Sequence, residues 1–444
     1  MLSKLLYNLF LILYSVGIRI ASAWNPKAKK WVQGRRNIFD TINAQLPTAN
    51  CQLIWMHCAS LGEFEQGRPL LEEFKIKNSE QKIVLTFFSP SGYEVMKDYK
   101  GADYVFYLPM DSPVNAKKFL DAVKPSLVLW VKYEYWFYYL TEIKQRNIPT
   151  ILISGIFRQN QPFFKWYGEI WRKMLETFTH FFVQNAGSKS LLNTLGFKDN
   201  VAINGDTRFD RVLEIANNFI AVSGMDEFCG DSLVIVAGST WEEDEIELLH
   251  FVKVHPEIKF IIAPHEIDET NLKDVKDEFP NSIFYSALVT ENSTEKSDSK
   301  TKNNQHPNNE QQKTSNELPS TPNVLIIDNI GMLSRLYKYA TVTYIGGGFG
   351  ADGVHNVLEA AVYGKPVIFG PVYQKFDEAV GLIDVAGAIS VDGPVSLELA
   401  LNNLLNDEAE RKRRGEAAKH FVYENGGASK KIIQFIQEKR LLTS

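Results

Sequence analysis

Short apolar segments alternate with longer segments of mixed polarity from about residue 50 to the end of the chain. The apolar segments are only a few residues long and rich in valine, isoleucine, leucine and phenylalanine, a composition typical of buried strands. The first series of expected strands is Leu53–His57, Ile83–Phe88, Tyr104–Tyr107, Leu127–Val131, Thr150–Ser154, Phe181–Gln184 and Val201–Asn204. The second series is Leu233–Ala237, Lys259–Ala263, Val324–Ile327, Val342–Ile345, Val367–Phe369 and Ala388–Val391. Because strands that alternate with helices form parallel sheets covered on both faces, this pattern predicts an α/β protein with two Rossmann-like domains.

The chain has 444 residues, more than one hydrophobic core usually holds, so its length also favours two domains. We place an N-terminal Rossmann-like domain at residues 25–215 and a C-terminal one at residues 216–425. Residues 290–322, within the second domain, are a polar, low-complexity tract with too few apolar side chains to fold, so we expect a disordered insert there. Residues 426–444 are expected to form a helix that packs back toward the first domain.

Residues 1–24 differ from the rest of the chain because they carry an almost continuous apolar run, Leu5–Ile18. The basic residues that follow this run are Lys27, Lys29, Lys30, Arg35 and Arg36. Since basic flanks stay cytoplasmic and attract anionic headgroups, we expect an uncleaved membrane anchor. The run is shorter than the roughly 20 residues that cross a bilayer comfortably, so the anchor should lie in the membrane or enter it only partly. Two alternatives stay open: a secretory signal with Ala21-Ser22-Ala23 as its cleavage site, and a buried first helix.

Composition narrows the classes of function. A net charge of −5 gives no general attraction to nucleic acid. The three cysteines, Cys51, Cys58 and Cys229, have no paired spacing, which argues against a disulfide framework or a zinc site and fits a reducing compartment. The isolated acidic residues form no convincing metal site, and the motifs of P-loop enzymes, HExxH metalloproteases and GxSxG hydrolases are absent from the sequence.

The most informative stretch is residues 346–361, GGGFGADGVHNVLEAA. Glycines such as Gly347 and Gly348 let a backbone approach a phosphate, and a helix N-terminus offers free N–H groups. His355 and Asn356 come next, and Glu359 follows Asn356 by about one helical turn, so both can face one ligand. A carboxylate there can accept two hydroxyl hydrogen bonds from a ribose. The alternative is a tight turn before a buried helix of small residues; the added HNxxE favours nucleotide binding.

Two acidic residues of the first domain are candidates for catalysis. A strand ends at His57, a small-residue loop follows, and Glu63 should lie in the first turn of the next helix, where open α/β sheets bind ligands. A carboxylate there can act as a general base, although a glutamate in a first turn can also serve the helix dipole alone. Glu134 follows a very apolar strand, and its alternative is a surface ion pair.

Further candidates come from three shorter motifs. Arg208 follows a strand end and a glycine turn and suits a carboxylate or phosphate, unless it only forms a salt bridge with a neighbouring aspartate. Ser239 and Thr240 precede acidic residues, which predicts an N-capped helix start; their hydroxyls can equally donate to a phosphate. His265 ends a strand, and a lone histidine is more often structural than functional.

Together these motifs resemble those of the Kdo (3-deoxy-D-manno-oct-2-ulosonic acid) transferases of lipopolysaccharide assembly. The resemblance is carried by H-x-x-S-x-G-E ending at Glu63, E-x-W beginning at Glu134, G-x-x-[KR]-F-D from Gly205 to Asp210, the Ser-Thr pair at Ser239, and G-G-x(6)-H-N-x-L-E-A-A from Gly347 to Ala361. It runs from the N-terminal anchor to the C-terminal helix, with only the polar tract interrupting it. Two positions depart from the family pattern: no arginine stands beside His265, and Phe137 follows Trp136 where the family usually has proline.

The resemblance implies a GT-B fold, in which two Rossmann-like domains face a cleft. It implies an inverting glycosyltransferase that uses CMP-Kdo as donor and a lipid A precursor, lipid IVA, as acceptor, without a metal or other cofactor. Its place would be the cytoplasmic face of the inner membrane. On this basis Glu63 would be the general base and Glu134 would shape the acceptor side. The donor residues would be Arg208, Ser239, Thr240, His265, Gly331, Gly347, Gly348, His355, Asn356 and Glu359.

Two other functions are weighed against this one. Another GT-B glycosyltransferase, using a UDP- or GDP-sugar on a membrane acceptor, would share the nucleotide motif but should not need the H-x-x-S-x-G-E run. A catalytically dead sugar-nucleotide-binding scaffold would have no need to keep Glu63 beside the full nucleotide motif.

Overall fold

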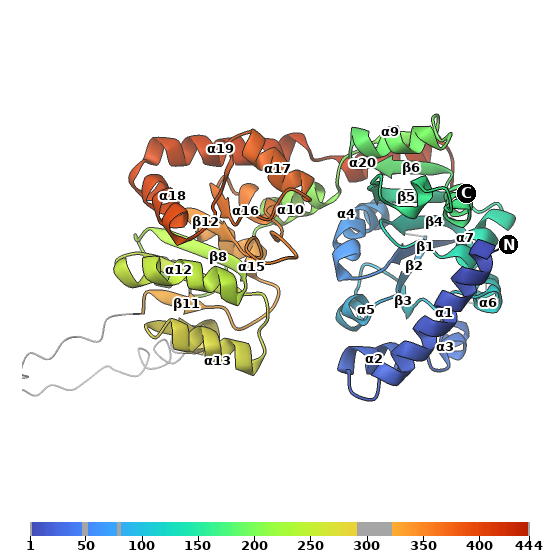
Figure 1. Ribbon diagram of the computed structural model, residues 1–444, viewed down its shortest axis with the longest axis horizontal. Coiled ribbons are helices and arrows are strands. Elements are labelled where there is room, and N and C mark those ends of the chain that lie inside the picture. Colours follow the sequence, from blue (N-terminus) through green and yellow to red (C-terminus); the bar gives the residue numbers. More distant parts are fainter. Residues whose placement is uncertain (1, 47–51, 78–80, 291–321, 443–444) are drawn as a thin grey trace, which may run out of the picture. The chain divides into compact units, whose positions relative to one another are not determined.

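The computed structural model describes residues 2–46, 52–77, 81–290 and 322–442. Most of the insert predicted at residues 290–322, and Cys51, lie outside these ranges. The chain divides into two compact units: Met1–Arg211 with Asn425–Ser444, and Val212–Glu424 (Figure 1). The sequence-based boundaries, 215/216 and 425/426, fall close to these divisions.

The first unit is built on a parallel sheet of seven strands in the order β3-β2-β1-β4-β5-β6-β7. Its strands are β1 (Leu53–Cys58), β2 (Lys82–Phe87), β3 (Tyr104–Tyr107), β4 (Pro125–Val131), β5 (Thr150–Gly155), β6 (His180–Val183) and β7 (Val201–Ile203). Every strand expected in the first series is present. Side chains on both faces of β1 and β4 are buried, because Trp55 and Trp130 pack into one core while Met56 and Leu129 pack into the other. Burial on both faces explains why these strands read as continuous apolar runs.

Helices cover both faces of this first sheet (Figure 1). They are α1 (Leu2–Ala21), α2 (Pro26–Gln33), α3 (Ile38–Gln45), α4 (Leu61–Lys77), α5 (Pro90–Met96), α6 (Pro113–Val123), α7 (Phe137–Gln145), the 3₁₀ turn η1 (Pro162–Phe164), α8 (Glu169–Leu175), α9 (Ala186–Thr194) and α20 (Ala428–Glu438). Helix α20 belongs to this unit although it ends the chain. The Asp210 carboxylate accepts hydrogen bonds from the backbone N–H groups of Gly427 and Ser429, and Ile433 is fully buried in the core beneath α4.

The second unit also has a parallel sheet of seven strands, in the order β10-β11-β9-β8-β12-β13-β14. Its strands are β8 (Val234–Thr240), β9 (Lys259–Pro264), β10 (Ser282–Phe284), β11 (Val324–Ile326), β12 (Val342–Ile345), β13 (Val367–Phe369) and β14 (Ala388–Ser390). All expected strands are present, and β10 is an additional one that the sequence pattern did not reveal. The prediction of an α/β protein with two Rossmann-like, parallel-sheet domains is confirmed.

The helices that accompany the second sheet are α10 (Arg208–Asn217), which begins in the first unit, α11 (Met225–Cys229), α12 (Glu242–Val254), α13 (Glu269–Glu278), α15 (Leu333–Leu336), the 3₁₀ turn η2 (Tyr337–Tyr339), α16 (Leu358–Ala361), α17 (Asp377–Asp384), α18 (Pro394–Asn406) and α19 (Glu408–Glu424). One prediction about these elements is wrong. Ser239 and Thr240 do not cap the start of α12, because β8 continues through both residues and Trp241 is the N-cap.

Helix α1 is amphipathic in its packing. Tyr7 and Leu11 are buried, and the Tyr7 hydroxyl donates to Asp111 Oδ2 at 2.7 Å. The Tyr138 hydroxyl donates to Asn8 Oδ1 at 2.6 Å. The large apolar side chains exposed on α1 are Leu5, Leu6, Leu9, Phe10, Ile12, Leu13, Val16 and Ile20. Within the described residues, Ser3–Ala21 is the one helical segment long and apolar enough to cross a membrane, by length and composition only.

Candidate active site

Open parallel sheets bind ligands beyond the carboxyl ends of their strands, at the point where the strand order reverses. In the first sheet this point lies between the neighbouring strands β1 and β4. In the second sheet it lies between β8 and β12. Glu63 and Glu134 follow β1 and β4, whereas Ser239 is the last residue but one of β8 and Gly347 follows β12. Each unit therefore carries two of its predicted site residues at its own switch point, whereas Arg208 follows the edge strand β7 and His265 follows β9.

Glu63 lies in the first turn of α4, after the short loop that leaves β1. Its carboxylate accepts a hydrogen bond from the Ser60 hydroxyl and is half-buried. Burial raises the pKa of Glu63, and the negative charge of Glu134 raises it further, outweighing the opposing effects of the Glu63 backbone N–H, Lys132 and His57. Glu63 is thus a carboxylate of increased basicity that responds to the charge on Glu134.

The Glu134 carboxylate is held between two rings. Trp136 Nε1 donates to its Oε2 at 3.0 Å, and His57 Nε2 lies 3.6 Å from the same oxygen. His57 Nδ1 shares a 2.9 Å hydrogen bond with Thr86 Oγ1. Among the described residues, Nε2 of His57 has no hydrogen-bond partner although the side chain is fully buried. A buried polar atom without a partner is unusual in a structural histidine, so His57 joins the candidates of this site.

The guanidinium of Arg208 forms a salt bridge with the Asp206 carboxylate. Its Nε donates to Asp206 Oδ2 at 2.9 Å, and its Nη2 lies 2.8 Å from the same oxygen. Burial alone would raise the pKa of Asp206, but the charges of Arg208 and Lys132 outweigh burial and lower it. The salt bridge that the sequence left as an alternative is therefore formed, and a ligand anion has to compete with Asp206 for the guanidinium.

In the second unit, three rings gather beyond β8, β9 and β12. Trp241 Nε1 donates to His355 Nε2 at 2.9 Å, and His265 stacks on both rings with centroid separations of 4.5 Å. Because an indole N–H can only donate, His355 Nε2 accepts, and the neutral ring carries its proton on Nδ1. Burial and the nearby His265 lower the pKa of His355 to about 4, so this ring is neutral at physiological pH.

The glycines after β12 pack closely against backbone. A Cβ on Gly346 would lie 2.3 Å from the Ser239 carbonyl oxygen, and one on Gly348 would lie 2.5 Å from the backbone nitrogen of Gly370. The backbone N–H of Gly347, which has a positive φ of 86°, donates to the buried Asp244 carboxylate at 2.7 Å. Close packing against backbone thus explains why residues 346 and 348 are glycine. The backbone N–H of Gly347 is already bonded to the Asp244 carboxylate.

Asn356 and Glu359 meet at the start of α16, as expected from their spacing. Asn356 Nδ2 donates to Glu359 Oε1 at 3.0 Å, and Asn356 Oδ1 accepts from the Leu358 backbone N–H. Glu359 is half-buried and its charge acts on the buried Tyr337. The pair forms a preorganised amide–carboxylate unit at a helix start.

Ser239 and Thr240 are neighbours with different roles. Thr240 is buried and its hydroxyl donates to Glu245 Oε1 at 2.7 Å. Ser239 is half-buried, has a left-handed backbone with a φ of 54°, and forms no side-chain hydrogen bond with another described residue. Of the two hydroxyls, only that of Ser239 is available to a ligand. Gly331 lies in an exposed turn before α15 with a φ of 95°, a conformation that favours glycine.

Two residues now join the site that sequence reasoning had not selected. His57 belongs to the motif that ends at Glu63, and Trp241 follows the Ser-Thr pair directly, so both stood beside selected residues. The signal that could have found them was their position at the end of a strand or directly after it, and not their residue type. Among the residues that the structure describes, no group of three or more His, Cys, Asp or Glu side chains is arranged to hold a metal ion.

Comparison with known proteins gives a family match in the first unit. Residues 33–211 match the family model described as 3-deoxy-D-manno-octulosonic-acid transferase (kdotransferase). A 3-deoxy-D-manno-octulosonic acid transferase of Haemophilus influenzae is 26% identical, with 96% of this chain and 95% of that protein covered. The chain is similar to Kdo transferases over most of its length. Its resemblance to Kdo transferases, expected from the motifs, is thereby confirmed, and the chain is a glycosyltransferase.

Two further similarities extend this result. A protein of Fusobacterium nucleatum named bifunctional glycosyltransferase/methyltransferase is 27% identical over 88% of this chain, which spans only 56% of that longer protein. The crystal structure of a UDP-GlcNAc 2-epimerase from Neisseria meningitidis superposes with a TM-score of 0.61 at 17% identity, covering 87% of this chain and all of that one. At that identity the likeness concerns the fold alone, and it is GT-B-like.

Proposed function

We propose that this protein is a Kdo transferase that moves Kdo from CMP-Kdo to a lipid A precursor, lipid IVA, with inversion at the anomeric carbon. The observation that carries the proposal is Glu63: a half-buried carboxylate of raised pKa at the switch point of the unit that matches the Kdo transferase model. A carboxylate with a pKa above that of an ordinary glutamate is a stronger base and abstracts a proton more effectively.

The reaction is a single displacement. The Glu63 carboxylate takes the proton of the acceptor hydroxyl as that oxygen forms a bond to the anomeric carbon of Kdo. The bond between this carbon and the phosphate oxygen of CMP breaks, and CMP leaves with the electron pair as a phosphate monoester. Glu134, which the Trp136 Nε1–H orients by a hydrogen bond, keeps Glu63 basic through its negative charge.

We assign the donor nucleotide to the second unit. Ser239 offers an uncommitted hydroxyl, and His355 offers its Nδ1 proton. Glu359, oriented by Asn356, is the group that would accept hydrogen bonds from the ribose hydroxyls. Gly331 lets a backbone turn approach the cytosine. Because charge develops on only one phosphate, such neutral donors can stabilise it, and we propose that the reaction needs no metal.

We further propose that α1 holds the protein at the cytoplasmic face of the inner membrane. Tyr7 and Asn8 tie one side of the helix to the first unit, so α1 is favoured to lie in the plane of the bilayer surface, with its exposed apolar residues in lipid. The basic residues Lys27, Lys29 and Lys30 follow on α2 and are placed to meet anionic headgroups. Flotation of the full chain with anionic vesicles measures this association.

The decisive test of the chemistry is transfer in vitro. The full chain, Glu63→Gln and the matched control Glu65→Gln would receive a tetra-acylated lipid A precursor and CMP-Kdo formed in situ, with EDTA added afterwards. Glu65 lies in the same turn but pairs with Arg68 and Arg211. Mass spectrometry should show Kdo added by the wild type and the control, with the rate of Glu63→Gln reduced by roughly 10²- to 10⁴-fold, as for loss of a general base. Turnover of a UDP- or GDP-sugar in place of CMP-Kdo would refute the proposed donor, and inhibition by EDTA would refute metal independence.

A further inference from the structure

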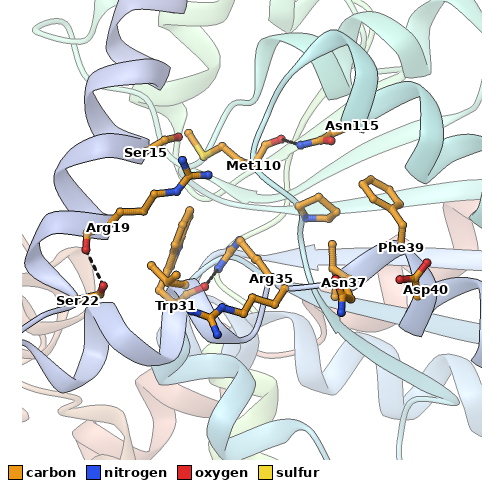
Figure 2. Close-up of a pocket in the computed structure, with 14 residues that line it drawn as sticks. Ser15, Arg19, Ser22, Trp31, Arg35, Asn37, Phe39, Asp40, Met110 and Asn115 are labelled. Carbon is orange, nitrogen blue, oxygen red and sulfur yellow. Dashed lines mark hydrogen bonds between the residues drawn. The ribbon is translucent and has the colours of Figure 1, made fainter.

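A pocket of about 830 Å³ lies in the first unit, and none of the residues assigned to catalysis lines it. Its walls come from α1, α2, the turn before α3, the start of α3, the segment after β3 and the start of α6 (Figure 2). Arg19 extends from α1 toward Met110 across the pocket, and Arg35 points in from the end of α2 (Figure 2). The charged residues that line it are Arg19, Arg35, Arg36 and Asp40, so cations outnumber carboxylates three to one.

The three arginines are not equivalent. Arg35 donates to the carbonyl oxygens of Leu108, Trp31 and Phe88 at 2.7–3.2 Å, and burial lowers its pKa to about 9, which leaves it charged at neutral pH. Arg19 and Arg36, by contrast, are exposed, and no described residue forms an ion pair with either. Two guanidinium groups are therefore free to bind an incoming anion, with a third buried behind them.

The polar lining also suits an anion. The Ser15 and Ser22 hydroxyls and the Asn37 and Asn115 amides lie among the arginines. A guanidinium presents a planar fork of N–H donors that matches the oxygens of a phosphate. The single carboxylate, Asp40, is exposed and leaves the pocket with an excess of two positive charges. A phosphate group fits this chemistry better than a neutral sugar, which would leave the charges unmatched.

Two observations indicate where such a phosphate comes from. The pocket borders α1, whose exposed apolar face we have proposed to lie in lipid, so a ligand anchored in the bilayer can reach it. Its back wall also leads to the proposed catalytic residues. Arg35 donates to the Phe88 carbonyl, the Phe88 ring lies 4.5 Å from that of Trp136, and Trp136 donates to Glu134.

We propose that this pocket binds a phosphate group of the membrane-bound acceptor, a phosphorylated glycolipid. The inference rests on the proposed function, because it gives the acceptor a place to be held while its hydroxyl reaches Glu63. Arg19 and Arg36 contact the phosphate. Arg35 fixes the position of the pocket wall relative to the loop that carries Glu134.

The test measures binding in mixed micelles without donor, so it does not depend on catalysis. Its probes are a tetra-acylated, phosphorylated lipid A precursor and the same glycolipid with its phosphates removed. The double variant Arg19→Gln/Arg36→Gln should bind the phosphorylated form about tenfold or more weakly and the dephosphorylated form as the wild type does. The matched control is Lys97→Gln/Lys100→Gln, which removes two exposed charges at the end of α5, outside the pocket, and should leave both affinities unchanged.

Three results would overturn the inference. An equal loss of affinity for both glycolipids in the double variant would show that the arginines do not recognise the phosphate. An equal loss in the lysine control would reduce the effect to general surface charge. The same dependence on Arg19 and Arg36 with phosphatidylglycerol micelles would assign the pocket to phospholipid headgroups. A wild type that binds the phosphorylated glycolipid selectively but transfers no Kdo would refute the proposed function instead, and the two failures are distinguishable.

Discussion

Glu63 shows how the local environment prepares one side chain for proton abstraction. The residue sits at a helix start, where the dipole alone would favour a charged, weakly basic carboxylate. Burial and the charge of Glu134 act in the opposite direction and prevail, so the pKa of Glu63 is raised. Basicity at this position therefore depends on two residues from two different strand ends.

That dependence predicts a shift in pH profile. Glu134→Gln removes a negative charge that raises the pKa of Glu63, so the pKa of Glu63 should fall. The acid limb of kcat/KM, which reports the base in the free enzyme, should then move to lower pH. Glu65→Gln should leave the limb in place, since Glu65 is paired with Arg68 and Arg211. An unmoved limb in Glu134→Gln, or the same movement in both variants, would contradict the assignment of Glu63 as the base.

Sequence reasoning placed most site residues correctly after strands but not their partners. The proximity of Asn356 and Glu359 follows from helical spacing, and the structure shows it. Sequence cannot show that Asp206 engages Arg208 or that Asp244 engages the Gly347 N–H, because each contact depends on how a loop folds back. The pairing of Trp241 with His355 joins residues 114 positions apart, a distance in sequence that no motif spans.

At the level of elements, the strands could be predicted from the sequence because both of their faces are buried, which makes them continuous apolar runs. Continuous apolar runs such as β1 and β4 have only one plausible place in an α/β fold. Strand β10 was missed because it has only three residues at the sheet edge, pairs on one side only, and carries a serine and two half-buried apolar residues. The end of β8 was misjudged because Ser-Thr before acidic residues is also a helix-start pattern, and the left-handed turn at Ser239 is invisible in composition.

Helix α1 provides a prediction at this scale. Leu9→Glu/Leu13→Glu puts two charges on its exposed apolar face, where 48% and 61% of these side chains are accessible. Flotation of the full chain with anionic vesicles should weaken by about tenfold or more, since each leucine contributes roughly 1.5–3 kcal/mol when buried in lipid. Ile246→Glu/Leu399→Glu, which alters exposed apolar residues of the second unit, should float as the wild type does. Equal flotation of all three proteins would rule out α1 as the anchor.

For the whole molecule, the two units have separate sheets and separate cores. Heating is therefore expected to give more than one transition, and one melting temperature does not describe the chain. A substitution in one core should move one transition only. This separability makes it possible to assign a stability effect to a unit without cutting the chain.

Glu245 is the residue with which to test this. It is buried in the second unit, and burial raises its pKa from 4.5 to about 7, against the opposing hydrogen bond from Thr240. A carboxyl whose folded pKa is raised costs stability as pH rises from its unfolded pKa, near 4.5, to its folded one. Glu245→Gln removes that charge, keeps an oxygen to accept from Thr240, and should stabilise the second unit by about 1–3 kcal/mol at pH 8. Its melting transition should rise by roughly 2–4 °C per kcal/mol.

At pH 4 the same variant should melt close to the wild type, because the glutamic acid is then protonated in both the folded and the unfolded chain. Calorimetry across this pH range, with the exposed Glu416→Gln of α19 as control, separates the effect from a general change in net charge. A gain in stability that does not depend on pH would show that burial does not raise the pKa of Glu245 in the folded protein. A shift of the first unit's transition would instead show that the two cores do not melt independently.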